Sequence, residues 1–200
     1  MSLVKKLFAK TPMARSTRAY EFGLARLPQL PTGGVLEIGT GQGYGAAFLS
    51  RAFPERQVIA IDITYGCFKP DRLEFGAHRP WFVQASAPYL PFADGVFALA
   101  TAIMTFHCLP EPQRVFGEVF RVLKKGGVFL MADVDGNHRI APWFERVEHW
   151  GGINPITRAY PPAEIEKLGA GAGFPPPRTF RRKPRGFMIW YIFQKQKSPL

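Results

Sequence analysis

The chain has 200 residues, of which 46% are hydrophobic and 20% are charged. This length suits one domain with a sizeable core and excludes two full domains, and the composition excludes a disordered chain. No apolar run approaches the roughly 20 residues that a membrane span needs. The first residues hold no apolar stretch of signal-peptide length, so a cytoplasmic protein is expected.

The net charge is +11, and the basic residues concentrate near the two ends of the sequence. Such a balance fits either an ordinary solvated surface or contact with nucleic acid, an anionic membrane or an acidic substrate. The two cysteines, Cys67 and Cys108, are too few for a disulfide framework. We expect both to be buried, reduced thiols.

The predicted elements alternate between helices and strands, which is typical of an α/β protein with a mostly parallel sheet. Helices are expected at residues 13–27, 46–52, 66–77, 112–123 and 163–173. Strands are expected at residues 35–38, 57–63, 81–84, 97–103, 128–132 and 187–193. Residues 124–127 (KKGG) are expected to end the helix before them, and residues 136–162 to be irregular.

The most specific local signal is the turn of residues 39–43 (GTGQG), which follows the first predicted strand and precedes a helix. Ligands of open parallel sheets bind beyond the carboxyl ends of the strands, where bare glycine backbone permits close approach. The amides at the start of the next helix attract a carboxylate or a phosphate. Glu37 places an acid beside the same pocket, which suits a cationic or amino-bearing ligand and repels a pyrophosphate.

A second signal is Asp62, at the end of the second predicted strand, where it suits hydrogen bonds to ribose hydroxyls. Nicotinamide and flavin enzymes share this feature, and Gly41, Gly43 and Ala46 match their pattern G-x-G-x-x-A. That motif alone is weak. The carboxylate of Glu37 would repel the pyrophosphate of a dinucleotide, and the rest of the sequence offers no clear nicotinamide or substrate domain.

Five segments in order carry a family resemblance. They are LEIGTGQG (36–43), VIAIDI (58–63), APYLPFADGVF (87–97), FHCLP (106–110) and EVFRVLKKGG (118–127). Together they resemble the class I S-adenosylmethionine-dependent methyltransferases of type 11, the group that includes ubiquinone and menaquinone methylases. The resemblance implies an α/β, Rossmann-like, doubly wound and mostly parallel seven-stranded sheet with helices on both faces.

The same resemblance implies one methyltransferase domain over residues 1–200. Its expected parts are a helical cap (1–30), a cofactor-binding core (31–135) and an acceptor-side segment with the last strands (136–200). The implied cofactor is S-adenosylmethionine. The residues expected to bind it are Glu37, Gly39, Thr40, Gly41, Gly43, Asp62, Ile63, Ser86, Ala87 and Ala102.

Within this set the resemblance implies particular roles. Glu37 is expected to help hold the amino group of the cofactor, Asp62 to bind the ribose hydroxyls, and Ile63 to pack on the adenine. Ser86 stands where the family commonly has an acid that accepts a hydrogen bond from the adenine amino group. A serine accepts without charge, so we expect weaker or re-routed adenine contacts.

Methyl transfer mainly requires positioning of the acceptor and exclusion of water, and it needs a base only where the acceptor must lose a proton. His107 is the candidate base, and the alternative is a histidine satisfied by backbone partners. Tyr20 is a candidate lid residue or a core aromatic residue. Trp143 and Trp150 are candidates for the acceptor pocket, or part of a small core under a long loop.

No metal site is expected. The spacing of Asp133, Asp135 and Asn137 does not fit a calcium loop, so this segment is expected at the rim of the pocket. His138 and His149 have no ligand spacing with each other or with a cysteine.

The sequence therefore predicts a methyltransferase acting on a small-molecule acceptor, and it leaves the acceptor and the oligomeric state open. One alternative is an RNA or protein methyltransferase that uses the basic termini. Another is a degenerate, non-catalytic cofactor-binding module, to which Ser86 points. A third is a peripheral membrane enzyme, because apolar residues and lysines interleave within residues 3–10.

Overall fold

The computed structural model describes residues 12–64, 67–69, 73–150 and 156–196, and they form an α/β fold around one sheet. Its seven strands lie in the order β3-β2-β1-β4-β5-β7-β6. Strands β1 to β5 are parallel, and β7 runs antiparallel to both of its neighbours. The strand bounds are β1 Gly34–Ile38, β2 Val58–Asp62, β3 Trp81–Gln84, β4 Phe97–Ile103, β5 Leu123–Val134, β6 Arg178–Phe180 and β7 Met188–Gln194. The predicted fold class is confirmed.

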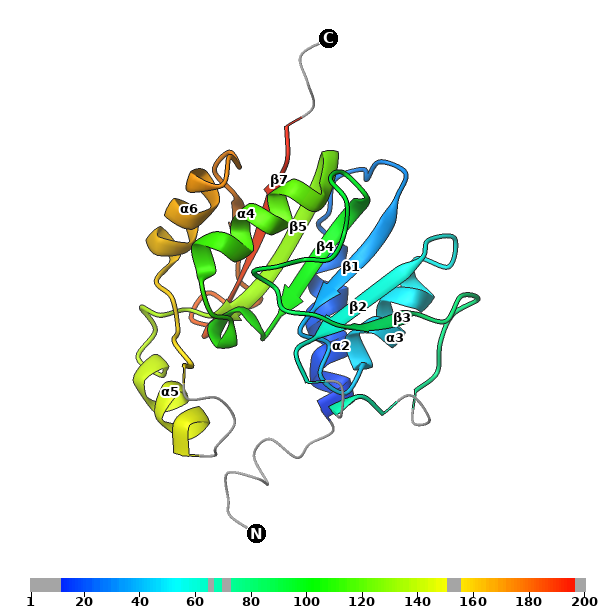
Figure 1. The fold of residues 1–200 in the computed structure, drawn as a ribbon. Coiled ribbons are helices and arrows are strands. Elements are labelled where there is room, and N and C mark those ends of the chain that lie inside the picture. Colours follow the sequence, from blue (N-terminus) through cyan, green and yellow to red (C-terminus); the bar gives the residue numbers. More distant parts are fainter. Residues whose placement is uncertain (1–11, 65–66, 70–72, 151–155, 197–200) are drawn as a thin grey trace.

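Helices cover both faces of this sheet (Figure 1). The helix bounds are α2 Pro12–Leu24, α3 Tyr44–Ala52, α4 Pro112–Val122, α5 Ala141–Trp150 and α6 Pro162–Gly171, with a short 3-10 helix at Phe106–Cys108. Apolar residues of α4 and α6 pack with one face of the sheet, and those of α2 and α3 pack with the other. The central strand β4 is buried almost throughout, as expected for a parallel strand covered on both faces.

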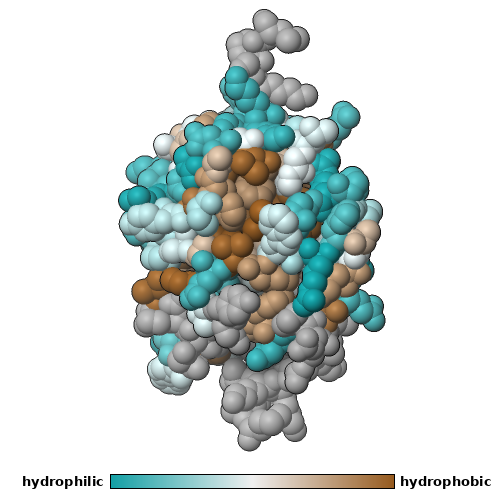
Figure 2. All heavy atoms as spheres, turned by 45° about the vertical axis from the view of Figure 1, so that its right-hand side comes forward, coloured by the Kyte–Doolittle hydropathy of each residue, from teal (hydrophilic) through white to brown (hydrophobic). Residues whose placement is uncertain are grey.

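The helix predicted over residues 66–77 is wrong for the part that the structure describes, since residues 67–69 and 73–77 form no α-helix. Pro70 and two glycines interrupt this segment, and these residue types disfavour a helix interior. Strand β3 is consequently only partly covered, and Trp81 at its start is 63% exposed. On the side of the molecule that Figure 2 brings forward, apolar surface forms a band between hydrophilic side chains.

The second half of the chain holds more regular structure than predicted. Helix α5 lies within residues 136–162, which were expected to be irregular, and β6 was not predicted. Helix α4 ends at Val122, and residues 123–127 already belong to β5, so the KKGG segment does not form the helix end. Sheet pairing of Phe97 with Leu123 overrides the local stop signal at this point.

Two further expectations are corrected or left open. Cys67 is exposed and Cys108 is half-buried, so neither is the fully buried thiol that was expected. Among the described residues no helix is long and apolar enough to cross a membrane. The segment 3–10, on which the peripheral-membrane alternative rested, lies outside the described residues.

Candidate functional site

The candidate site lies where the parallel strands end. Strand β1 runs into the turn of residues 39–43, which leads into α3, and β2 beside it ends at Asp62. Both oxygens of Asp62 accept backbone hydrogen bonds, from the Gly41 N–H at 2.8 Å and from the Thr64 N–H at 2.9 Å. The acid therefore fixes the glycine turn and keeps further lone pairs for a ligand.

All three glycines of the turn have positive φ angles, 72° at Gly39, 52° at Gly41 and 91° at Gly43, a region that L-residues with a side chain rarely adopt. A Cβ on Gly39 would collide with the side chain of Thr105, whereas a Cβ on Gly41 would meet no atom within 4 Å. Gly39 is thus required by packing against the loop after β4. Gly41 instead presents bare backbone to open space, as a ligand that approaches the chain closely would need.

Glu37 on β1 is the buried centre of the turn, with only 2% of its surface exposed. The Tyr20 hydroxyl donates to Oε1 and the Thr40 hydroxyl donates to Oε2, each at 2.5 Å. A Cβ on Gly45 would collide with both Glu37 and Tyr20, so this position must be a glycine for the three to meet. Tyr20 is buried, which agrees with the core alternative and not with an open lid residue.

The pKa of Glu37 is raised to about 7 because burial disfavours the charged carboxylate. Hydrogen bonds from Thr40, Tyr20 and the Ala46 backbone lower it again, but only in part. All these donors are neutral. A ligand cation in hydrogen-bond reach of this carboxylate would supply the opposite charge that the protein itself does not place there.

The other residues expected to bind the cofactor differ in what they expose. Ile63, directly after Asp62, is 65% exposed although it is apolar. Ser86 is half-buried in the loop after β3. Ala87 and Ala102 are buried in the core, so a ligand would meet their backbone and not their methyl groups.

Met104, which was not predicted, stands at the end of β4 in a left-handed conformation with a φ of 54°. A methionine at such a φ is strained, and strain of this kind clusters at functional sites. The Met104 N–H donates to the Ala132 carbonyl at 2.8 Å, which ties this strand end to β5. Sequence alone gives no signal for this residue.

A second buried pair, His107 and Asp133, lies at the ends of β4 and β5. The ring Nδ1 of His107 is 2.7 Å from Asp133 Oδ1, and the His107 backbone N–H donates to Oδ2 at 3.1 Å. The ring also packs edge-on against Phe144 of α5, with ring centres 4.9 Å apart. The ring is therefore held through Nδ1 by a carboxylate and not by the backbone partners of the alternative interpretation, and the Cys108 thiol also interacts with it.

The pKa of His107 is raised to about 10. Burial lowers it, because the imidazolium loses solvation, and the Asp133 carboxylate together with the Cys108 side chain raises it by more through charge and hydrogen bonds. Such a pair holds a proton firmly at neutral pH, and its neutral form is a strong base.

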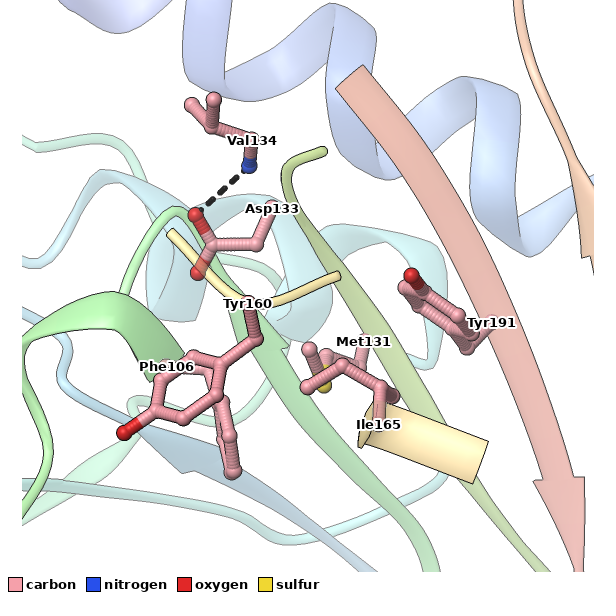
Figure 3. Close-up of a pocket in the computed structure, with 7 residues that line it drawn as sticks. All are labelled: Phe106, Met131, Asp133, Val134, Tyr160, Ile165 and Tyr191. Carbon is pink, nitrogen blue, oxygen red and sulfur yellow. Dashed lines mark hydrogen bonds between the residues drawn. The ribbon is translucent and has the colours of Figure 1, made fainter. Parts of the chain in front are cut away.

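A narrow gap lies behind this pair, between α6 and the strands β5 and β7 (Figure 3). Figure 3 shows Met131 and Ile165 between Tyr160 and Tyr191, while Asp133 turns toward the Val134 N–H, which donates to it at 2.7 Å. The gap is too tight for a water molecule, so it does not hold an acceptor in this conformation. The Tyr191 hydroxyl is buried there without a hydrogen-bond partner among the described residues.

Trp143 and Trp150, the candidates for an acceptor pocket, both lie on α5 with much of their surface exposed. Phe144 of the same helix faces inward to His107. The structure thus brings Phe144 to the base, not the two tryptophans. In the sequence, the three-residue spacing of the apolar residues Ala141 and Phe144 is the signal that places both on one face of a helix.

One group of potential metal ligands occurs among the described residues. Ligand atoms of His107, Cys108 and Glu148 lie within 4.8 Å of one another. Sequence spacing could not reveal this group, because Glu148 reaches it from α5. The hydrogen bond to Asp133 already accounts for the orientation of His107, and we assign no metal here.

A hollow of about 440 Å³ opens at the opposite edge of the sheet, lined by Asp94, Arg121, Lys195 and their neighbours. Arg121 is paired with Asp94 and Glu118, and Lys195 donates to two backbone carbonyls. The cations that could bind a ligand there are already engaged by the protein, so the strand ends remain the candidate site.

Comparison with known proteins agrees with this geometry. Residues 36–131 match a family model described as a methyltransferase domain. The chain is 34% identical over 117 residues to the phthiotriol/phenolphthiotriol dimycocerosates methyltransferase of Mycobacterium tuberculosis. It is 33% identical over 109 residues to the fatty-acid O-methyltransferase of Mycolicibacterium smegmatis. These matches cover 58% and 54% of this chain but only 43% and 40% of the two relatives.

Solved structures extend the likeness to nearly the whole chain. An S-adenosylmethionine-dependent methyltransferase of Mesorhizobium loti superimposes with a TM-score of 0.73 at 14% identity and covers 92% of this chain and 100% of its own. One from Thermotoga maritima gives 0.71 at 20% identity, over 96% of this chain and 94% of its own. At these identities the likeness establishes the fold.

Proposed function

We propose that this chain is a class I S-adenosylmethionine-dependent methyltransferase, which the match to the methyltransferase family model, the relatives and the fold support, and that it transfers a methyl group from S-adenosylmethionine to an oxygen atom of an apolar small molecule. The observation that carries this proposal is the buried carboxylate of Glu37, compensated only by neutral donors beside an open glycine backbone. The ammonium of the cofactor supplies the missing positive charge.

The residues at the strand ends fit the rest of the cofactor. Asp62, fixed by two backbone donors, offers its remaining lone pairs to the ribose hydroxyls. Ile63 provides an exposed apolar surface on which the adenine packs. Ser86 would accept from the adenine edge without charge, so the adenine contributes less to affinity than an acid at this position would allow.

The bound cofactor supplies a methyl group on a good leaving group, so this chain's residues have to position the acceptor and exclude water. In its neutral form, which grows as pH rises toward its pKa of about 10, His107 takes the proton from an acceptor hydroxyl, so turnover with such an acceptor should rise with pH. Asp133 holds the ring in the tautomer with the proton on Nδ1 and stabilises the imidazolium that forms. Phe144 closes one side of the ring and keeps it from water.

The chemistry of the acceptor is proposed from the relatives. One is named for phthiotriol dimycocerosates and another for fatty acids, both apolar acceptors. The chain spans less than half the length of these relatives, so its own acceptor need not be either compound. A hydroxyl acceptor would use the base, whereas a carboxylate acceptor is ionised already at neutral pH and would need only positioning.

Calorimetric titration of the full chain with S-adenosylmethionine and with NAD tests the proposal. We expect micromolar binding of the first and none of the second. Asp62→Ala should abolish the binding, and Glu37→Gln should weaken it by roughly 10- to 100-fold, the value of one charged hydrogen bond. A matched control is Asp94→Ala, which removes an acid at the opposite edge. Tight NAD binding without S-adenosylmethionine binding would overturn the proposal, and binding without turnover on any acceptor would favour the non-catalytic module.

A further inference from the structure

We infer that the edge of the molecule around α5 and the loop of residues 181–187 docks onto an anionic phospholipid bilayer. We call this edge the docking rim and define it by Arg182, Lys183, Arg185, Phe187 and the exposed side chains of α5. The docking itself rests on the surface described below. Only the idea that the bilayer delivers the acceptor rests on the proposed function.

The first observation is where this rim lies. Strand β7 runs antiparallel to β5, so the loop before it meets the end of β5. The Asp135 N–H donates to the Phe187 carbonyl at 2.8 Å, and Arg181 forms an ion pair with Asp135. Helix α5 follows β5 directly and contacts His107 through Phe144. The rim therefore lies at the same edge of the sheet as the candidate site (Figure 1).

The second observation is the apolar surface that the rim exposes. Trp150 is 85% exposed, Trp143 44% and Phe187 43%. Isolated exposed apolar residues are common, but these three belong to one rim. Tryptophan in particular favours the bilayer interface, where its ring is buried while its N–H stays hydrated.

The third observation is the charge of the rim. Arg182, Lys183 and Arg185 are exposed in the loop, and Arg139 and Arg146 are exposed around the start of α5. No ion pair occurs at these five cations within the part of the chain that the structure describes.

Four acids of this edge are already engaged. Asp133 is bound to His107, Asp135 to Arg181, and Glu164 to Arg158, while Glu145 accepts the Ala159 N–H. Glu148 of α5 lies beside His107 and Cys108, and it leaves the five cations in excess. The free charge of the rim is thus positive, complementary to anionic lipid headgroups.

Cations and outward apolar side chains at one edge favour a bilayer over a nucleic acid. A single strand needs a basic groove along which its backbone runs, whereas the cations of the rim are exposed side chains of a loop and of residues around the start of α5. A bilayer takes the cations at the headgroups and the aromatic rings just below them. An apolar acceptor dissolved in that bilayer would reach the strand ends without crossing water.

Vesicle co-sedimentation tests the inference, with neutral phosphatidylcholine vesicles and with vesicles that contain 30% phosphatidylglycerol. We expect the full chain to bind the anionic vesicles and hardly the neutral ones, with affinity falling as salt rises. Arg182→Gln/Lys183→Gln should weaken binding by about 10-fold or more, since each cation near the surface contributes about a factor of five. The matched control is Lys124→Gln/Lys125→Gln, which removes the same charge where β5 begins, at the opposite edge.

The apolar contribution has its own pair of variants. Trp143→Ser should weaken vesicle binding, while Trp81→Ser, a similarly exposed tryptophan at the start of β3, should not. Affinity for S-adenosylmethionine should stay the same in Arg182→Gln/Lys183→Gln, which shows that it is folded and separates this inference from the proposed function. No binding to anionic vesicles, equal losses in variant and control, or tighter binding to single-stranded RNA than to vesicles at the same salt would each overturn it.

Discussion

Two buried carboxylates stand at the ends of parallel strands, Glu37 on β1 and Asp133 on β5, and the protein compensates them differently. Glu37 receives hydrogen bonds from two hydroxyls and a backbone amide, all neutral, and burial raises its pKa to about 7. Asp133 is paired with an imidazole whose pKa it raises to about 10. The first acid is left ready for a cation from outside, and the second already has a cation within the fold.

This difference gives the two halves of the site different roles. The β1–β2 side would receive its missing positive charge from a bound cationic ligand. The β4–β5 side holds a proton between His107 and Asp133, and it needs no ligand to balance its charge. The predictions below separate the two sides by changing one while the other serves as the control.

The largest effect is expected at the base. Near pH 10, where the wild-type imidazole is about half neutral, His107→Gln should lower kcat with a hydroxyl acceptor by about 10²- to 10⁴-fold, the usual contribution of general base catalysis. Affinity for S-adenosylmethionine should be unchanged, since His107 belongs to the other side of the site. Steady-state kinetics and calorimetry on the same preparation check both values. An unchanged kcat would assign His107 to a structural role.

Removing the acid of the same pair should cost stability. Asp133→Ala leaves the His107 ring buried without its partner, and breaking a buried pair in this way costs about 3–5 kcal/mol of unfolding free energy. Glu37→Ala breaks no ion pair and should cost clearly less. Urea denaturation at pH 7 compares the two variants. Equal losses would contradict the distinction between a paired and an unpaired acid.

The pH dependence of stability should also separate the two sides. The folded pKa of Glu37, about 7, is above its unfolded value near 4.5, so the folded state holds the proton more tightly and stability falls as pH rises from about 4.5 to 7. The shift corresponds to on the order of 3 kcal/mol at most. The pKa of His107 is raised as well. The stability that His107 contributes is therefore fully present below about pH 6.5 and is lost as pH rises toward 10. Glu37→Gln should remove the loss of stability below pH 7 and leave the loss of stability above pH 7. Thermal unfolding of the ligand-free chain as a function of pH measures both.

The same two sides differ in what the sequence could reveal. The glycine turn, Glu37 and Asp62 are contiguous with their strands, so local pattern places them correctly at one edge of the sheet. The part played by Tyr20 depends on a hydrogen bond across 17 residues, and that of Asp133 on one across 26. Such contacts exist only once the sheet has formed, and a single sequence shows neither.

The acceptor side was predicted least well for a related reason. Helix α5 presents only Ala141 and Phe144 to the interior, so its apolar periodicity is weak, and the exposed tryptophans mask it. Strand β6 has three residues and owes its conformation to pairing with β7. At Leu123 pairing with β4 replaced the expected helix end. In each case tertiary contacts decided what local propensity left open.

The smallest effect is expected behind the base, at Tyr191. Its hydroxyl is buried without a partner among the described residues, and burial raises the pKa of this phenol. An unsatisfied buried polar group costs about 1–3 kcal/mol, so Tyr191→Phe should stabilise the fold by about 1 kcal/mol once the small void left behind is included. For a chain of this length that is roughly 2–4 °C in Tm. Tyr160→Phe is the matched control, because its hydroxyl interacts with Arg158 and its removal should be neutral or destabilising. A fall in Tm for Tyr191→Phe would contradict an unsatisfied hydroxyl at this position.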